Sequence, residues 1–198
     1  KGAGPVVWAA VRKGRIDMEA LIVVDMQNDF IDGALGTKEA EAIVPNVVKK
    51  IQEFHEDGEH RILYTRDTHG ENYLETQEGV NLPVVHCVKG TKGWEICPEV
   101  EALRKENPID KPSFGSPVLG QVLKAQDEDL RKQGKEGITS VTLIGLCTDI
   151  CVITNALLVK AYLPEVPVIV ESDCCAGVTV ESHNNALEAM KMCQIQIR

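Results

Sequence analysis

The amino-acid sequence predicts an α/β fold in which helices cover both faces of a parallel β-sheet. Short apolar runs rich in β-branched residues alternate along the chain with segments of helical periodicity, the pattern of repeated strand and helix units. The runs are apolar at consecutive positions, as expected for strands that are buried on both faces. Several of these runs are followed directly by polar residues suited to chemistry. Because ligands bind outside the carboxyl ends of the strands in an open parallel sheet, we expect a functional site there.

The first strand and helix follow in order from Met18. The continuous apolar run from Ala20 to Val24 predicts a buried strand. Apolar residues at helical spacing between positions 42 and 54 predict the first helix, which we expect Asp57-Gly58 to end. Residues 1–17 precede this unit and are unlike the rest of the chain. We interpret them as an N-terminal extension, either native or vector-derived.

Further strands and helices are predicted in the remainder of the chain. The expected strands cover residues 62–66, 141–145, 166–171 and 195–197, and the expected helices cover residues 117–133, 152–162 and 181–191. The region 70–98 is rich in Gly, Pro, Asn and Glu and is predicted to be a long loop, which in a compact domain is usually functional. No repeat or linker interrupts the pattern, so residues 18–198 are predicted to form one domain.

Composition and charge favour a small-molecule partner. The chain of 198 residues is 43% hydrophobic and 26% charged, which is ordinary for a globular protein. Its net charge of −9 argues against nucleic acid and against an anionic membrane surface, since both attract basic proteins. No apolar run approaches the roughly 20 residues of a membrane span. We therefore expect no nucleic-acid or membrane partner.

The seven cysteines indicate a reducing environment. Their number is odd, and most lie inside or beside apolar strands without the dense, regular spacing of a secreted disulfide scaffold. We therefore expect reduced thiols and a cytoplasmic location.

Cys151 is the candidate nucleophile. It follows the predicted strand 141–145 by a short turn and falls in the first turn of the next helix, where free N–H groups and the helix dipole lower a thiol pKa. The same amides could hold an oxyanion. Two other interpretations remain open: Cys151 could be a small buried hydrophobe, or Cys147 and Cys151 could bind a metal or form a redox pair. Their C-x-x-x-C spacing matches neither the usual redox motif nor a familiar zinc motif.

A metal site is predicted beside the end of the strand at residues 62–66. Asp67 and His69 are separated by one residue, so on extended backbone both side chains face the same way, and His86 could return after the long loop as a third ligand. One carboxylate and two imidazoles suit Zn²⁺, Mn²⁺ or Fe²⁺ with open positions for water and ligand. The remaining histidines are expected to be ordinary surface residues: His55, His60 and His183.

Five segments, in order from Met18 to the carboxyl end, resemble the isochorismatase-like cysteine hydrolases, and specifically their nicotinamidase/pyrazinamidase branch. These segments are residues 23–30 (VVDMQNDF), 67–69 (DTH), 83–91 (PVVHCVKGT), 111–114 (KPSF) and 145–152 (GLCTDICV). The resemblance implies a Rossmann-like three-layer α/β/α sandwich with a mainly parallel sheet. It also implies an Asp-Lys-Cys catalytic triad, which falls on Asp25, Lys111 and Cys151.

The chemistry of amide hydrolysis accounts for the three residue types of the implied triad. Asp25 can accept the proton of the Cys151 thiol and later give it to departing ammonia, acting first as general base and then as general acid. Lys111 is expected between them as a fixed positive charge that favours the thiolate and holds the carboxylate. Taken singly, Asp25 could instead cap a turn and Lys111 could be solvated.

The resemblance assigns the oxyanion site to the backbone N–H groups of Cys147 and Cys151. It also implies a cis peptide bond before Cys147 that turns this N–H inward. The family more often has Ala at the position of Cys147, but a role of the backbone alone is compatible with either side chain.

The resemblance also extends the metal and substrate sites. Relatives in the nicotinamidase branch sometimes have a fourth metal ligand in the long loop, for which Glu78 is the candidate and Glu75 the second choice. The expected cofactor is one divalent transition metal, with zinc preferred over manganese or iron. Phe30 and Trp94 are predicted to contact the ring of the substrate, although Trp94 could be part of the loop core.

The expected function is therefore metal-dependent hydrolysis of nicotinamide to nicotinate and ammonia through a cysteine thioester. A different small amide as the substrate is the alternative within enzymes. A non-catalytic protein with a structural metal site is the alternative outside them. We also expect a homo-oligomer.

Overall fold

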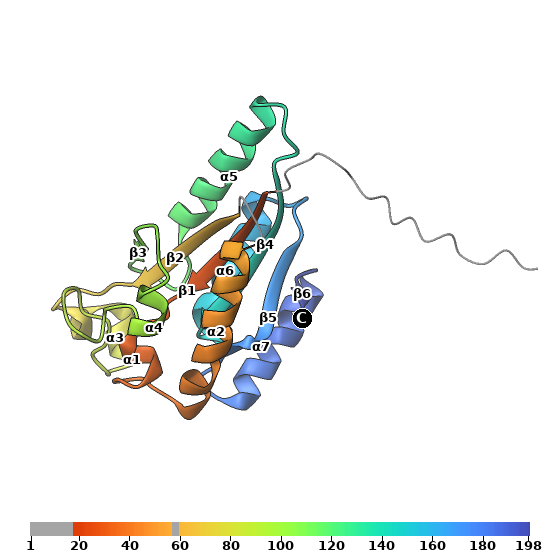
Figure 1. Ribbon diagram of the computed structural model, residues 1–198. Helices are drawn as coiled ribbons and strands as arrows, with labels where there is room; N and C mark the ends of the chain where they lie inside the picture. Colours follow the sequence, from red (N-terminus) through yellow and green to blue (C-terminus); the bar gives the residue numbers. More distant parts are fainter. Residues whose placement is uncertain (1–17, 57–59) are drawn as a thin grey trace, which may run out of the picture.

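The computed structural model describes residues 18–56 and 60–198, which form one six-stranded parallel sheet with helices on both faces (Figure 1). The strands are β1 (Met18–Val24), β2 (Arg61–Asp67), β3 (Ile109–Lys111), β4 (Ile138–Leu146), β5 (Val168–Ala176) and β6 (Gln196–Ile197). They lie in the order β3-β2-β1-β4-β5-β6. This is the predicted α/β/α sandwich. The expected extension at residues 1–17 and the expected helix stop at 57–58 lie outside the described residues.

The helices agree with the predicted pattern and add short elements in the connections. They are α1 (Asn28–Ile31), α2 (Lys38–Glu56), α3 (Gln77–Asn81), α4 (Pro98–Glu101), α5 (Pro117–Lys132), α6 (Ile153–Tyr162) and α7 (Val180–Met192), with a 3₁₀ turn η1 (Tyr73–Glu75) and a π-helical turn η2 (Thr148–Val152). The region 70–98 is therefore not a bare loop, because η1 and α3 lie within it. The predicted strand at 166–171 begins two residues later and runs on to Ala176.

Strand β1 shows why its sequence is apolar at consecutive positions. Ala20, Ile22 and Val24 join the core on one face of the sheet, where side chains of α5, α6 and α7 pack. Leu21 and Val23 join the core on the other face, under α2 and α4. Each side chain from Ala20 to Val24 is thus removed from water, and full burial of a Val, Leu or Ile side chain contributes about 1.5–3 kcal/mol.

The two central strands, β1 and β4, form the point where the order of the sheet reverses. From β1 the chain builds outward through β2 to β3, and it then crosses back to β4 and builds outward on the other side. Gly145 near the end of β4 has φ +116°, and a Cβ there would lie 2.1 Å from the carbonyl oxygen of Val24. Only glycine permits this approach of the two strand ends. The edge beside them is where an open α/β sheet binds ligands.

The fold bears on two expectations from composition. Across residues 18–56 and 60–198, no helix has the length and apolar character needed to cross a membrane. All seven cysteines lie within these ranges, and each is an unpaired thiol.

Candidate active site and metal centre

The three residues of the expected triad lie together at the carboxyl edge of the sheet. The Nζ atom of Lys111 is 2.7 Å from Oδ2 of Asp25 and 3.4 Å from Sγ of Cys151. All three residues are buried, with exposed fractions of 0%, 1% and 4% for Asp25, Lys111 and Cys151. The ammonium group therefore lies between a carboxylate and a thiol in a site almost free of solvent.

Asp25 is held by the neighbouring strand. It follows β1 directly, and its backbone is in the left-handed region with φ 46°, which is uncommon for a residue other than glycine. Its N–H donates to the carbonyl of Thr65 at 3.2 Å, and the Thr65 hydroxyl donates to Oδ1 at 2.7 Å. These two bonds leave Oδ2 directed at Lys111, the last residue of β3.

Cys151 lies in the turn η2 rather than in a regular α-helix. The carbonyl of Cys147 accepts hydrogen bonds from the N–H groups of Ile150 at 3.1 Å and Val152 at 3.0 Å, so the chain turns tightly around the nucleophile. The peptide bond between Leu146 and Cys147 is cis, as the resemblance implied.

Asn155 is a buried residue that sequence reasoning did not single out. Its Nδ2 donates to the carbonyl of Cys151 at 2.8 Å and to that of Phe114 at 3.2 Å, and its Oδ1 accepts from the N–H of Ser116 at 2.9 Å. It thereby connects the nucleophile to the segment that follows Lys111. The only signal in the sequence was its position four residues after Cys151, on the same face of a helix.

Burial alters the electrostatics that were expected for a thiol in the first turn of a helix. Burial raises the pKa of the Cys151 thiol well above its usual range, Asp25 adds to this, and Lys111 opposes it. Full burial thus opposes the lowering of this pKa that was expected from the helix end. Burial also raises the pKa of Asp25 despite the neighbouring Lys111, which makes its carboxylate a stronger proton acceptor.

Lys111 remains charged in this environment. Burial alone would lower its pKa, but Asp25, Cys151 and Asp67 together raise it well above the usual range. An ammonium group therefore lies between the carboxyl group of Asp25 and the thiol of Cys151.

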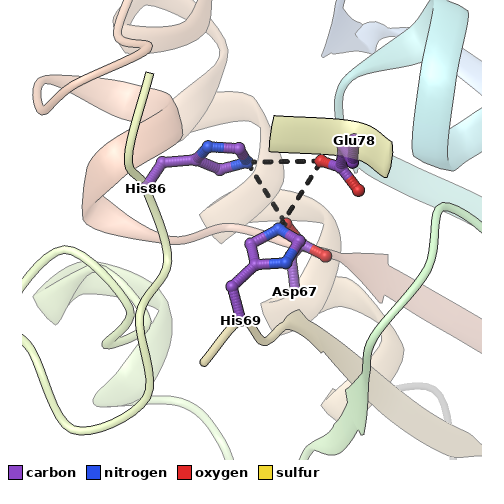
Figure 2. Close-up of side chains that lie close together, drawn as sticks. All are labelled: Asp67, His69, Glu78 and His86. Carbon is purple, nitrogen blue, oxygen red and sulfur yellow. Dashed lines mark ion pairs between the residues drawn. The ribbon is translucent and has the colours of Figure 1, made fainter. Parts of the chain in front are cut away.

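A second cluster lies beside the triad and contains four possible metal ligands: Asp67, His69, Glu78 and His86. One ligand atom of each lies within 4.8 Å of the others, and Figure 2 shows the four side chains converging. Nε2 of His69 is 2.9 Å from Oδ2 of Asp67 and 3.6 Å from Oε1 of Glu78. Glu75, the second choice for the fourth ligand, is exposed and does not belong to the cluster.

The donor atoms of this cluster fit a divalent transition metal. Nε2 of His69 is buried and has no hydrogen-bond partner within the described part of the chain, despite the nearby carboxylate. Nδ1 of His86 is bonded to the carbonyl of Val84 at 2.8 Å, which leaves Nε2 directed at the cluster. This is the usual arrangement of a metal-binding imidazole, whose other nitrogen donates to a backbone carbonyl. Two imidazoles and two carboxylates suit zinc, manganese or iron.

Electrostatics keep a negative charge in the cluster. Burial alone would raise the pKa of Asp67, but His69, His86 and Lys111 together hold it well below its usual range. Burial raises the pKa of Glu78, an effect that His69 and His86 partly offset and Asp67 strengthens.

Backbone pairing brings the ligands together. Asp67 is the last residue of β2, and the N–H of His69, two residues on, donates to the carbonyl of Cys87 at 3.0 Å. This bond aligns the segment that carries His86 with His69. The buried side chain of Gln27 accepts from the N–H of Asp67 at 2.6 Å and donates to its carbonyl at 2.9 Å. Gln27 thus fixes the end of β2, a role that sequence reasoning missed.

The triad and the cluster open into one cavity of about 450 Å³. Cys151, Asp67, Glu78 and His86 line it, whereas Asp25, Lys111 and His69 are not among its lining residues. Much of its wall is apolar and is formed by Phe30, Leu35, Leu82, Phe114, Ile150 and Val178. Phe30, a predicted ring contact, also packs against His86, with ring centroids 5.5 Å apart.

Trp94, the other predicted ring contact, does not line this cavity. Its Nε1 donates to the Thr68 hydroxyl at 2.8 Å, and the guanidinium of Arg66 lies 3.4 Å from the ring centroid. The structure thus gives Trp94 a place in loop packing and none in the cavity. The hydrogen bond to Thr68 and the contact with Arg66 account for the position of the Trp94 side chain better than any contact with substrate.

Comparison with known proteins shows the family to which this chain belongs. The Isochorismatase domain family matches residues 19–198. A nicotinamidase/pyrazinamidase of Mycobacterium tuberculosis is 27% identical over 195 residues, covering 91% of this chain and 98% of the relative. The structure of a pyrazinamidase of Pyrococcus horikoshii in complex with zinc has 32% identity and a TM-score of 0.72, covering 91% of this chain and 98% of that chain. The structure of an N-carbamoylsarcosine amidase from Thermoplasma acidophilum has 26% identity and a TM-score of 0.67, covering 92% of this chain and 96% of that chain. Since the family match spans the whole sheet and both halves of the site, the chain belongs to the isochorismatase family of hydrolases.

Proposed function

We propose that this hydrolase is a metal-dependent amidase that converts nicotinamide to nicotinate and ammonia through a thioester on Cys151. One observation carries the proposal: the nucleophile and the metal-ligand cluster line the same cavity. A pyridine carboxamide needs both, because its amide carbon must reach a nucleophile while its ring nitrogen can serve as a ligand. The similarity to proteins named nicotinamidase or pyrazinamidase supports this choice.

In the first step, the carboxylate of Asp25 takes the proton of the Cys151 thiol as the sulfur attacks the amide carbon. A bond forms between Sγ and the carbon, and the carbonyl electron pair moves to the oxygen. The ammonium of Lys111, 3.4 Å from Sγ, stabilises the developing thiolate. The ion pair and the thiol already lie in contact, so little rearrangement is needed.

The oxyanion would be held by the N–H groups of Cys147 and Cys151 in the turn η2. Fixed donors of this kind stabilise the charge that develops in the transition state. Asp25 then returns its proton to the departing nitrogen, and the carbon–nitrogen bond breaks to leave ammonia and the thioester. In the second half of the reaction, Asp25 takes a proton from the water that attacks the thioester carbon. The carbon–sulfur bond then breaks, and Asp25 returns this proton to the departing sulfur, which leaves the carboxylic acid and the Cys151 thiol.

Asp67, His69, Glu78 and His86 would hold the metal ion. A bound divalent cation supplies Lewis acidity, which can hold a ring nitrogen and polarise water. Phe30 offers an apolar face for a flat ring next to His86. The chain itself thus provides a ring site and a nucleophile within one cavity, with the proton carrier Asp25 buried beside the nucleophile.

The test is ammonia release from nicotinamide by the purified protein, before and after treatment with a chelator. We expect release that the chelator abolishes and that added zinc or manganese restores. No release from nicotinamide in metal-loaded protein would overturn the proposal.

Another small amide is the second candidate. The cavity of about 450 Å³ falls within the range of roughly 300–1,000 Å³ that accommodates drug-sized ligands, so it has room for more than a single small ring. The resemblance in fold to an N-carbamoylsarcosine amidase is compatible with this alternative. A panel of ring-substituted and acyclic amides in the ammonia assay would distinguish the two.

A further inference from the structure

His183 contacts the turn that carries the nucleophile, although the sequence suggested an ordinary surface histidine. Its Nδ1 lies 2.8 Å from the hydroxyl oxygen of Thr148. Thr148 is fully buried and directly follows Cys147. His183 itself is half-buried in the first turn of α7. A side chain from a different helix is therefore hydrogen-bonded inside η2.

Two further contacts connect the same regions. The N–H of Val178 donates to both carboxylate oxygens of Asp149 at 3.2 Å. At Gly177, an added Cβ would lie 2.9 Å from Cβ of His183, so the chain before α7 lies directly against this histidine. The start of α7 is itself fixed, because Thr179 and Ser182 cap it with reciprocal side-chain bonds to each other's backbone N–H groups.

We propose that His183 is a positioning residue that, through Thr148, holds the N–H groups of Cys147 and Cys151 in place for the oxyanion. Thr148 shares a peptide bond with Cys147, so rotation of Thr148 would turn the backbone of Cys147 within the turn that carries the nucleophile. Oxyanion donors act only when they are fixed at the right position. A shift of about 1 Å in such a group can reduce a rate about a hundredfold. This inference rests on the proposed thioester mechanism.

The contact is geometric and not a charge pair. Burial lowers the pKa of His183, an effect that Asp149 on η2 opposes, so the net shift favours the neutral ring. A neutral side chain with a polar atom at the position of Nδ1 should therefore replace it. Asn has such an atom, whereas Leu has a similar shape without one.

Four variants separate positioning from structure. His183→Leu and Thr148→Val remove the bond, and His183→Asn and Thr148→Ser retain it. For each variant, kcat and KM are measured with nicotinamide and with p-nitrophenyl acetate, whose hydrolysis forms the same kind of oxyanion. The rate of Cys151 alkylation by iodoacetamide is measured in parallel, because this displacement forms no oxyanion. His55→Leu is the matched control, since His55 contacts the carbonyl of Leu103 and does not line the cavity.

We expect kcat to fall about ten- to a hundredfold in His183→Leu and Thr148→Val, with KM and the alkylation rate changing less than about threefold. The kcat values of His183→Asn and Thr148→Ser, which retain the hydrogen bond, should lie within about threefold of the wild-type value. The double variant His183→Leu/Thr148→Val should be no slower than the slower single variant, because both remove the same interaction.

Several outcomes would overturn the inference. An unchanged kcat in folded His183→Leu, even with a lower melting temperature, would show that the contact serves stability alone. Equal losses in His183→Leu and His183→Asn would show that the hydrogen bond is not what matters. If the wild type hydrolyses only the ester, nicotinamide is the wrong substrate, and the ester rates of the variants still decide the role of His183. If the wild type hydrolyses neither compound faster than Cys151→Ala, the proposed mechanism fails and this inference fails with it.

Discussion

The two halves of the cavity are built in different ways. In the triad, Asp25 and Lys111 are fixed at the ends of β1 and β3, and Cys151 is fixed in a turn bonded to its neighbours. In the metal-ligand cluster, only Asp67 lies on a strand, and the other ligands come from the connection after β2. Glu78 has a side chain that is 20% exposed, whereas that of Asp25 is fully buried.

The difference indicates which half depends on a bound ion. The triad is complete in protein groups alone, because its ammonium balances its carboxylate. The cluster contains two carboxylates, and its buried His69 nitrogen has no hydrogen-bond partner among the described residues. Removal of metal should therefore disturb the connection after β2 and leave the triad in place.

The largest effect is expected from Cys151→Ala. Loss of the nucleophile should reduce amide hydrolysis by at least about 10⁴-fold, because no covalent step remains, while metal content stays unchanged. Ammonia release and metal analysis of the purified variant check this. Cys147→Ala is the matched control and should stay within about threefold of the wild type, since only its backbone is used. Substantial activity in Cys151→Ala would refute the thioester mechanism.

The next effect concerns the metal half. His69→Ala should lose most bound metal and about a hundredfold or more in kcat/KM, whereas Glu78→Ala should lose less of both because Glu78 is the most exposed ligand. Iodoacetamide should still modify Cys151 in both variants. A wild-type protein that contains no transition metal and is indifferent to chelation would instead point to a metal-free amidase. Equal losses of metal and of kcat/KM in His69→Ala and Glu78→Ala would show that the exposure of a ligand does not determine its contribution to metal binding.

Lys111→Ala tests the link between the halves, because Nζ of Lys111 is also 3.4 Å from Oδ1 of Asp67. Lys111 opposes the effect of burial on the Cys151 thiol, so its removal should raise the pKa of that thiol further. The alkylation of Cys151 should then shift to higher pH, and hydrolysis at neutral pH should fall by about ten- to a hundredfold. Metal content should not decrease. An unshifted alkylation profile would show that Lys111 does not act on the thiol.

The smallest effect is expected from Trp94→Phe. The variant removes the bond to Thr68, which should cost about 1 kcal/mol of stability, and it should leave KM within about twofold of the wild type. Phe30→Ala, which opens the cavity wall beside His86, should raise KM more than Trp94→Phe does. Thermal unfolding and steady-state kinetics compare the two variants. A larger change of KM in Trp94→Phe than in Phe30→Ala would restore Trp94 as a substrate contact.

Strand ends could be predicted from the sequence because a run of consecutive apolar residues that stops at a polar residue is typical of a buried strand reaching the edge of its sheet. This pattern placed Asp25 and Asp67 at one edge, whereas Lys111 was assigned through the resemblance. The choice of Glu78 over Glu75 relied on the resemblance, since nothing in periodicity distinguishes two glutamates three residues apart.

Contacts between distant elements could not be predicted in this way. For Trp94, the sequence left open a contact with the substrate ring or a place in the loop core, and Arg66 and Thr68 are groups that it meets. His183 was expected to be an ordinary surface residue, and nothing in the sequence of its helix indicates the contact with Thr148. The pKa of Cys151 depends on complete burial by several elements, which a helix-start motif does not reveal.

The hydrogen bonds of Asn155 limit how this enzyme could be redesigned for other substrates. Phe114 lines the cavity, yet its carbonyl shares the Asn155 amide with the carbonyl of Cys151. A loop exchange in the segment 113–116 would therefore displace the nucleophile unless it preserved that carbonyl. Leu35 and Leu82 line the same cavity with apolar side chains that form no hydrogen bond. New substrate preferences should thus be reached more readily, in evolution or in the laboratory, by changes at these two leucines.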